Sequence, residues 1–129
     1  MQNRNSAQRN LILSIMEGNK SHPTADEIYE QARQSDPHIS RGTVYRNLNL
    51  LVENELLLRV PVPGAPDHFD SMLDQHYHFY CRNCNRVFDV PEFNTEDVQA
   101  VETKLGKMGF KSITHKIVFE GLCPECSKK

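Results

Sequence analysis

Apolar residues recur at three- and four-residue spacing in three successive segments of the first half, which predicts three helices. The first covers residues 6–17. The second starts at Thr24, because Thr24 followed by Glu27 is the signature of a capping box, and it stops before Pro37. The third covers residues 41–52 after Ser40, a candidate N-cap. Its buried face is predicted to hold Val44, Leu48, Leu51 and Val52.

The pattern then changes to short β-type runs at residues 56–60 and 67–70, which flank a turn rich in proline and glycine. A hairpin directly after a third helix is the order of a winged-helix domain. In such domains the third helix enters the major groove of DNA. The first half of the chain is therefore predicted to be a winged-helix DNA-binding domain.

The second half predicts strands at residues 76–81 and 86–90, a helix over residues 95–107 and a long β-type stretch over residues 110–122. This gives an α+β chain with a DNA-binding domain at 1–70, a hinge at 71–75 and a small α/β dimerisation domain at 76–129. A unit of about 60 residues is marginally stable alone. A structural metal and a dimer interface are the usual remedies.

Composition agrees with a globular protein of 129 residues, 38% hydrophobic and 25% charged. The sequence shows no apolar run of about 18 residues and no apolar N-terminal leader, so we expect a cytoplasmic protein without a membrane partner. The net charge of −2 gives no global argument for nucleic acid, so that argument is local. The candidate DNA contacts of the third helix are Arg41, Thr43, Tyr45, Arg46 and Asn47. The alternative is a solvated surface of a small helical bundle.

All four cysteines fall in two Cys-x-x-Cys pairs, Cys81 with Cys84 and Cys123 with Cys126. In a reducing compartment such pairs are more often metal ligands than disulfides. Four thiolates without an open position favour a tetrahedral, structural Zn²⁺. The alternative is two separate redox dithiols.

Two histidines precede the first cysteine pair, and a strand would project His76 and His78 from the same face. Asp89 lies on the adjacent predicted strand and Asp70 on the approach from the wing, and His22 could add a third histidine. Such a set prefers Fe²⁺, Mn²⁺ or Zn²⁺ over Mg²⁺ or Ca²⁺. Bound metal would then set the angle between the two domains. Alternatively, His22 is only a helix-entry residue and each aspartate a turn or surface carboxylate.

Five stretches, in order along nearly the whole chain, form a specific combination. They are Ala7-Gln8-Arg9, His22-Pro23-Thr24-Ala25-Asp26-Glu27-Ile28-Tyr29, Thr43-Val44-Tyr45-Arg46-Asn47-Leu48, His76-x-His78 with Cys81-x-x-Cys84, and Gly121-Leu122-Cys123-Pro124-Glu125-Cys126. With these stretches the chain resembles the ferric uptake regulator (Fur) family. The resemblance implies a winged-helix repressor, homodimeric through its C-terminal domain, that binds double-stranded operator DNA when a regulatory metal is present.

Within the family the sequence is most similar to the peroxide-responsive repressors. This resemblance implies that His22, Asp70, His76, His78 and Asp89 are the regulatory ligands for Fe²⁺ or Mn²⁺. Asp89 stands where iron-uptake members usually carry glutamate. In peroxide sensors bound Fe²⁺ reacts with hydrogen peroxide and a ligand histidine is oxidised, here His22 or His76. Loss of that ligand would release the DNA, whereas Mn²⁺ would hold the same shape and resist this chemistry.

The sequence also departs from the family pattern. Its first helix matches the family's second, so the usual first helix is missing or reduced to residues 1–5. Gln75 and Tyr77 stand where many iron-uptake members carry ligands of a second regulatory site, so we expect that site to be absent. His115 matches one ligand of that site and is interpreted as structural, and His68 is given no metal role.

Three other functions remain open. The first is an iron- or zinc-uptake repressor that reports the metal level and not peroxide. The second is a small non-haem iron enzyme built on the same histidines and aspartates. We do not expect an enzyme, because a saturated five-ligand site leaves no place for a substrate. The third is a zinc-stabilised protein-interaction module without DNA binding.

Overall fold

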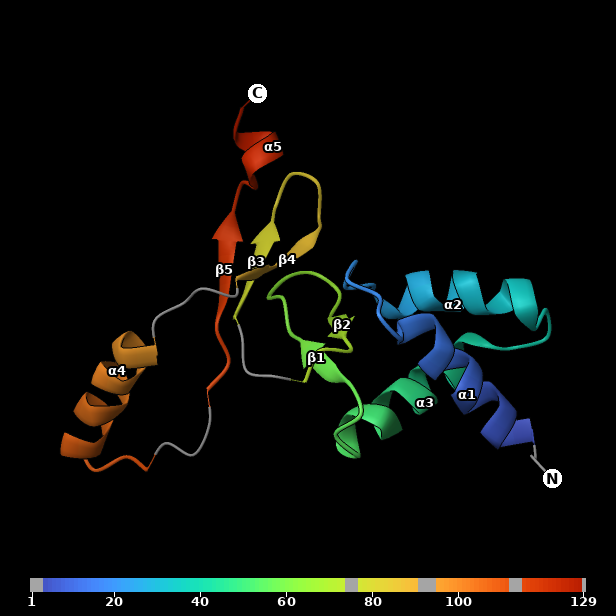
Figure 1. Cartoon of the computed structure of the whole chain (residues 1–129), viewed down its shortest axis with the longest axis horizontal. Helices are drawn as coiled ribbons and strands as arrows, with labels where there is room; N and C mark the ends of the chain where they lie inside the picture. The colour runs from blue at the N-terminus through green and yellow to red at the C-terminus, as the bar shows by residue number, and fades with distance from the viewer. Residues whose placement is uncertain (1–3, 74–76, 91–94, 112–114, 129) are drawn as a thin grey trace.

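The computed structural model describes residues 4–73, 77–90, 95–111 and 115–128 (Figure 1). Three helices form one end of the molecule: α1 (Arg4–Met16), α2 (Ala25–Ser35) and α3 (Arg41–Glu53). Their apolar faces meet in a core whose central side chains are fully buried. This core includes Ile12, Met16, Ile28, Val44, Leu48 and Leu51.

The helix starts follow from local capping. Before α2 the Thr24 hydroxyl accepts a hydrogen bond from the Glu27 N–H at 3.2 Å, and the Glu27 carboxylate accepts one from the Thr24 N–H at 3.0 Å. Before α3 the Ser40 hydroxyl accepts from the Thr43 N–H at 3.1 Å. The predicted caps are confirmed, and α1 begins two residues before its predicted start.

A short antiparallel hairpin follows α3 and forms the wing. Its strands are β1 (Leu58–Val60) and β2 (His68–Asp70), with Leu58 opposite Asp70 and Val60 opposite His68. Both strands are shorter than predicted. Three helices followed by this hairpin make a winged-helix domain, which confirms the predicted architecture of the first half.

The second half contains a three-stranded sheet with the order β4-β3-β5. The central strand β3 (Tyr77–Cys81) pairs antiparallel with β4 (Val87–Val90) and parallel with β5 (Val118–Gly121). The helix α4 (Thr95–Lys107) has the predicted bounds and lies apart from the sheet, at the end of the molecule opposite the helical core (Figure 1). A single turn of helix, α5 (Pro124–Ser127), ends the described chain.

The predicted long strand over residues 110–122 is wrong, because among the described residues of this segment only Val118–Gly121 form a strand. A strand needs a partner with which to exchange backbone hydrogen bonds. β3 is only five residues long, and its pairing with β5 runs from His78 opposite Val118 to Cys81 opposite Gly121. Residues 112–114 of the predicted strand lie outside the described residues.

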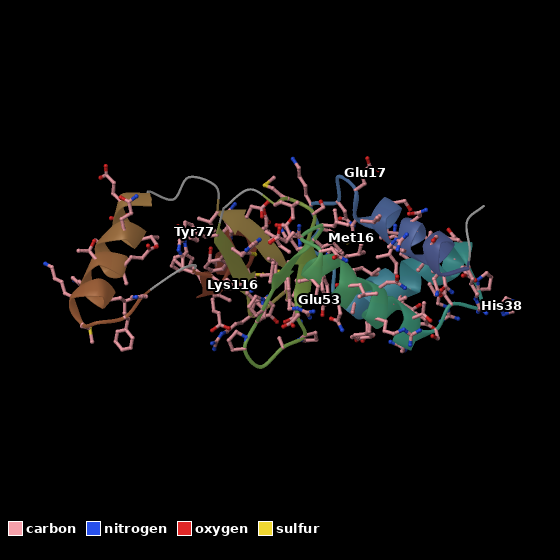
Figure 2. The ribbon with its side chains drawn as sticks, turned by 90° about the horizontal axis from the view of Figure 1, so that it is seen from below. Met16, Glu17, His38, Glu53, Tyr77 and Lys116 are labelled. Atoms are coloured by element: carbon pink, nitrogen blue, oxygen red, sulfur yellow. The ribbon has the colours of Figure 1, made fainter. Side chains whose placement is uncertain are left out.

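The wing also contacts the sheet. Val60 and Val62 pack against Tyr80 of β3 and Val87 of β4 in a small apolar cluster that is nearly inaccessible to solvent. The wing therefore lies between the helical core and the sheet, as the side view also shows (Figure 2). Among the described residues, no helix is long and apolar enough to cross a membrane. The boundary expected at residues 71–75 stays a prediction.

Candidate metal centres

The four cysteines meet where β3 ends and α5 begins. Their sulfur atoms all lie within 4.8 Å of one another, and the Sγ atoms of Cys84 and Cys123 are 3.9 Å apart. A tetrahedral Zn²⁺ with Zn–S bonds of about 2.3 Å separates its sulfur ligands by about 3.8 Å. The cysteine cluster therefore fits a structural zinc ion.

Hydrogen bonds and burial shift the pKa values of the cysteine thiols in opposite directions. The backbone N–H of Cys84 donates to the Cys81 sulfur and, against the effect of burial and with help from the Cys123 N–H, lowers the pKa of Cys81 to about 6. The Arg86 N–H lowers the pKa of Cys84, but burial and the neighbouring sulfurs raise it to about 11. At neutral pH Cys84 is therefore a thiol without a cation, and a bound cation is what allows all four sulfurs to be thiolates.

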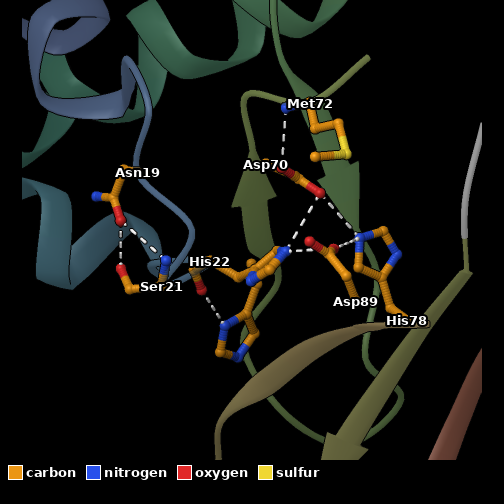
Figure 3. Close-up of polar contacts among 8 residues, drawn as sticks. Asn19, Ser21, His22, Asp70, Met72, His78 and Asp89 are labelled. Atoms are coloured by element: carbon orange, nitrogen blue, oxygen red, sulfur yellow. Dashed lines mark hydrogen bonds and ion pairs between the residues drawn. The ribbon is translucent and has the colours of Figure 1, made fainter. Parts of the chain in front are cut away.

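A second cluster joins four side chains from distant parts of the chain (Figure 3). His22 Nε2 lies 2.8 Å from Asp89 Oδ1 and 3.2 Å from Asp70 Oδ2. His78 Nε2 lies 3.0 Å from the same Asp70 oxygen and 3.6 Å from the same Asp89 oxygen. Two imidazoles therefore share two carboxylates around one centre.

Each donor reaches this centre from a different element. His78 and Asp89 face each other in the antiparallel register of β3 and β4. Asp70 is the last residue of β2, and His22 lies in the loop between α1 and α2. The cluster thus connects the helical core, the wing and the sheet. Of the five ligands predicted from sequence, the structure brings these four together, and His76 lies outside the described residues.

The donor distances suit a transition metal. Nitrogen and oxygen ligands bind such ions at about 2.1 Å, which places neighbouring ligands about 3.0 Å apart. Separations of 2.8, 3.0, 3.2 and 3.6 Å lie around that value. Two imidazoles and two carboxylates match the preference of Fe²⁺ and Mn²⁺ for mixed nitrogen and oxygen ligands. The His22 cluster, as we call His22, Asp70, His78 and Asp89, therefore fits such an ion.

Charge at the centre also acts on His22 directly. Burial of the ring opposes its protonation, but the hydrogen bond and the charge of Asp70, followed by those of Asp89, outweigh that effect and raise the pKa of His22 above 6.5. In the absence of metal, a proton on His22 therefore supplies part of the positive charge that the two carboxylates require.

A residue without a role in the sequence analysis lies directly behind His22. His68 is buried, and its Nδ1 is 2.6 Å from the backbone carbonyl oxygen of His22. His68 and Asp70 are two residues apart on β2, so the alternation of side chains along a strand places both on the same side. This alternation is the sequence signal that could have identified His68.

His115 has two partners outside the His22 cluster. Its Nε2 lies 3.2 Å from the Tyr77 hydroxyl and its Nδ1 lies 3.1 Å from a carboxylate oxygen of Glu102 in α4. The rings of His115 and Tyr77 are also stacked, with their centroids 5.8 Å apart. Through these contacts His115 connects α4 to β3, which agrees with a structural role for this histidine.

The candidate DNA contacts lie on α3, where Arg41, Tyr45 and Arg46 are exposed, and Thr43 and Asn47 half-buried. Asn47 donates to the carbonyl of Thr43 one turn earlier in the helix. Arg41 and Tyr45 both donate to one carboxylate oxygen of Asp26 in α2. The five side chains are thus partly organised within the protein.

Comparisons with known proteins agree with this architecture. The model of the ferric uptake regulator family matches residues 1–120. The chain is 34% identical over 122 residues to the peroxide operon regulator of Bacillus subtilis (strain 168), covering 95% of this chain and 83% of that protein.

Two solved structures share the fold. The Campylobacter jejuni peroxide stress regulator is 27% identical, with a TM-score of 0.74 over 95% of this chain and 91% of that one. A zinc uptake regulator, solved with zinc and DNA, is 25% identical, with a TM-score of 0.74 over 97% of this chain and 84% of that one. With the family model spanning nearly its whole length, this chain belongs to the ferric uptake regulator family.

Proposed function

We propose that this protein is a metal-dependent transcriptional repressor that senses hydrogen peroxide through the His22 cluster. The observation that carries the proposal is the convergence of His22, Asp70, His78 and Asp89 from three parts of a winged-helix chain. His76 is proposed as the fifth ligand. Similarity to two peroxide regulators, from Bacillus subtilis and Campylobacter jejuni, supports the assignment of the signal.

The four side chains act as a clamp on domain orientation. Asp70 and Asp89 repel each other across the centre unless a cation balances them. A metal ion bound by all four donors joins the loop before α2 to β3 and β4, and so favours one orientation of α3 relative to the sheet. Among the four residues of the His22 cluster, His22 alone comes from the helical end of the chain, so losing its donor frees that end from the centre.

The peroxide response follows from the chemistry of the ion in this setting. When bound, Fe²⁺ supplies the electrons that reduce hydrogen peroxide beside a histidine ring, whereas Mn²⁺ holds the same ligands and resists this reaction. His22 and His76 are the proposed sites of oxidation. The ring of His22 is buried at the centre of the cluster. Oxidation of this ring would weaken its bond to the ion and so weaken the clamp.

DNA binding is assigned to α3 and the wing. The proposed contacts are Arg41, Thr43, Tyr45, Arg46 and Asn47, which present cationic and polar groups to base edges and phosphates. A homodimer would bring two such helices to a two-fold symmetric operator. The proposed dimer surface is the apolar one that α4, β5 and their neighbours expose. It contains Val101, Met108, Phe110, Phe119 and Leu122.

The winged-helix domain would end at residue 70 and the dimerisation domain would start at residue 76, with the hinge between them. We propose a structural zinc ion at Cys81, Cys84, Cys123 and Cys126, a cytoplasmic location and no enzymatic turnover. The donor atoms of the His22 cluster lie within 4.8 Å of one another, which suits a ligand set more than a substrate pocket.

The test compares the Fe²⁺ and Mn²⁺ forms before and after brief exposure to hydrogen peroxide. The DNA probe is a duplex selected from a random pool by the Mn²⁺ form, and binding is followed by fluorescence anisotropy. We expect both forms to bind the duplex and only the Fe²⁺ form to release it after peroxide. Mass spectrometry should then find one added oxygen on the peptide that contains His22 or His76.

Matched variants separate this function from its rivals. His22→Ala should abolish metal-dependent DNA binding, whereas His38→Ala, which changes an exposed histidine outside the cluster, should behave like the parent. Metal-dependent binding without added oxygen would identify a repressor that reports the metal level. Absence of DNA binding in every metal form would refute the repressor assignment altogether.

A further inference from the structure

The ring of His22 lacks the support that a metal-binding histidine normally has. Such a histidine binds the ion through one nitrogen and donates the other N–H to a carbonyl or carboxylate, which fixes the orientation of the ring. His22 Nε2 faces Asp70 and Asp89, but its Nδ1 is buried and meets no hydrogen-bond partner among the described residues. The orientation of this ring must therefore be set through its backbone.

The backbone of His22 is in an unfavourable conformation. Its φ is 53°, in the left-handed region that residues other than glycine seldom adopt. The two residues after His22 are bound to the wing. The Phe69 N–H donates to the Pro23 carbonyl at 2.9 Å, and Thr24 forms an isolated β-bridge with His68. The conformation of His22 itself needs a further contact to hold it.

His68 makes that contact. The carbonyl oxygen of His22 can only accept a hydrogen bond, so the His68 Nδ1 at 2.6 Å must carry the proton. The ring of His68 is 4% exposed and meets the ring of Tyr80 edge-on, with centroids 6.0 Å apart, which limits its own rotation. Strand β2 therefore holds His22 twice, its backbone through His68 and its imidazole through Asp70 (Figure 3).

We propose that His68 is a positioning residue of the regulatory metal site. It directs the His22 imidazole to the ion by fixing the backbone that carries it, and it is not itself a ligand. The proposal rests on the proposed function of the His22 cluster. It assigns to His68 the supporting role that a partner of His22 Nδ1 would otherwise fill.

Two substitutions distinguish hydrogen bonding from packing at this position. His68→Leu fills the position with an apolar side chain and removes the donor. His68→Asn is smaller, but its amide nitrogen can take the place of Nδ1 and donate to the same carbonyl. Each variant would be prepared with structural zinc in place and without regulatory metal, and then titrated with Mn²⁺.

We expect His68→Leu to weaken Mn²⁺ binding by about 10- to 100-fold and His68→Asn to weaken it far less. Co²⁺ provides a spectroscopic readout, because its visible absorption depends on its ligand set. The spectrum of His68→Leu should approach that of His22→Ala, and the spectrum of His68→Asn that of the parent. Thermal unfolding of the metal-free variants reports any loss of stability separately.

Unchanged Mn²⁺ affinity in His68→Leu would overturn the inference. Equal losses in both variants would also overturn it, because packing and not the donated hydrogen bond would then be responsible. If His68→Leu does not fold, the affinity and Co²⁺ spectrum of His68→Asn still decide. The proposed function fails separately, and is the part refuted, if the parent and His22→Ala bind Mn²⁺ equally well.

Discussion

His22 Nε2 lies 3.2 Å from Asp70 and 2.8 Å from Asp89, so the protonation of one ring affects the stability of the metal-free protein. Despite the opposing effect of burial, Asp70 and then Asp89 raise the pKa of His22 above its ordinary 6.5. The folded state therefore binds the proton more tightly than the unfolded chain. The stabilisation is fully present below pH 6.5 and is lost as the pH rises through the raised pKa.

We predict that His22→Gln destabilises the protein more at pH 6 than at pH 9, when structural zinc is bound and the regulatory metal is absent. Denaturant unfolding at several pH values measures the difference in the free energy of unfolding between parent and variant. His38→Gln serves as the control, because His38 is exposed and lies outside the His22 cluster. A difference for His22→Gln that grows with rising pH would contradict a raised pKa of His22.

At this scale, all four members of the His22 cluster were predicted, but local sequence pattern accounts for only part of it. His78 and Asp89 follow from the register of one hairpin, since antiparallel pairing places them opposite each other. The position of His22 depends on how the loop before α2 packs on the wing, which local pattern does not encode. Strand alternation places His68 on the side of Asp70, but its role was missed because it acts through the backbone carbonyl of His22, a contact that alternation does not indicate.

At the scale of elements, α2 and α3 are joined by a contact that involves the proposed DNA-binding face. Asp26, at the start of α2, accepts hydrogen bonds from Arg41 at 2.5 Å and from Tyr45 at 3.2 Å. The Arg41 guanidinium also stacks over the Tyr29 ring, 4.6 Å from its centroid. A DNA phosphate would therefore have to compete with the Asp26 carboxylate for Arg41.

We predict that Asp26→Asn strengthens DNA binding by the Mn²⁺ form. Removing the charge frees Arg41, while the amide oxygen can still accept from Tyr45. The gain should stay below about tenfold, because exposed ion pairs contribute at most about 1 kcal/mol. Anisotropy titrations with the selected duplex should show the gain shrinking as salt is added.

Asp97→Asn removes an equal charge from exposed α4 and is the matched control. Its effect on affinity should be smaller than that of Asp26→Asn, because Asp97 lies in the proposed dimerisation domain. Weaker DNA binding by Asp26→Asn would contradict the prediction and would make Asp26 a residue that orients Arg41 and Tyr45 for DNA.

The elements themselves were predicted where their causes are local. The capping box at Thr24 and Glu27 located the start of α2, and apolar periodicity gave α4 its bounds. The strand expected over residues 110–122 failed because β-branched residues favour a strand without supplying its partner. Only the length of β3 available for pairing decides where β5 begins and ends.

At the scale of the whole molecule, the buried side chains form separate clusters. The core of the helices, around Ile12, Ile28 and Leu48, shares no residue with the cluster of cysteines packed against Phe88. The wing contributes the small group between them, where Val60 and Val62 meet Tyr80. Loss of the structural zinc should therefore unfold the half that contains the sheet before the half that contains the helical core.

Removal of structural zinc tests this separation. Cys81 ends β3, whereas Cys123 and Cys126 follow β5, so the ion fastens the parallel pair of strands at one end. Without it, the four sulfurs lose the cation that balances them, and β5 should detach from β3. The expected result after strong chelation is loss of amide protection at Arg82, whose N–H donates to the Gly121 carbonyl at 2.8 Å.

Amides of the helical core should stay protected under the same conditions, among them that of Ile28, which donates to the Thr24 carbonyl at 3.0 Å. Hydrogen exchange followed by mass spectrometry measures both regions in one sample. A weaker chelator that takes only the regulatory metal is the control and should leave Arg82 protected. Simultaneous loss of protection at Arg82 and Ile28 would mean that the two halves unfold as one unit. Retained helices with a released β5 would instead mean that the winged-helix domain folds independently, so that the metals govern how it is held and not whether it is folded.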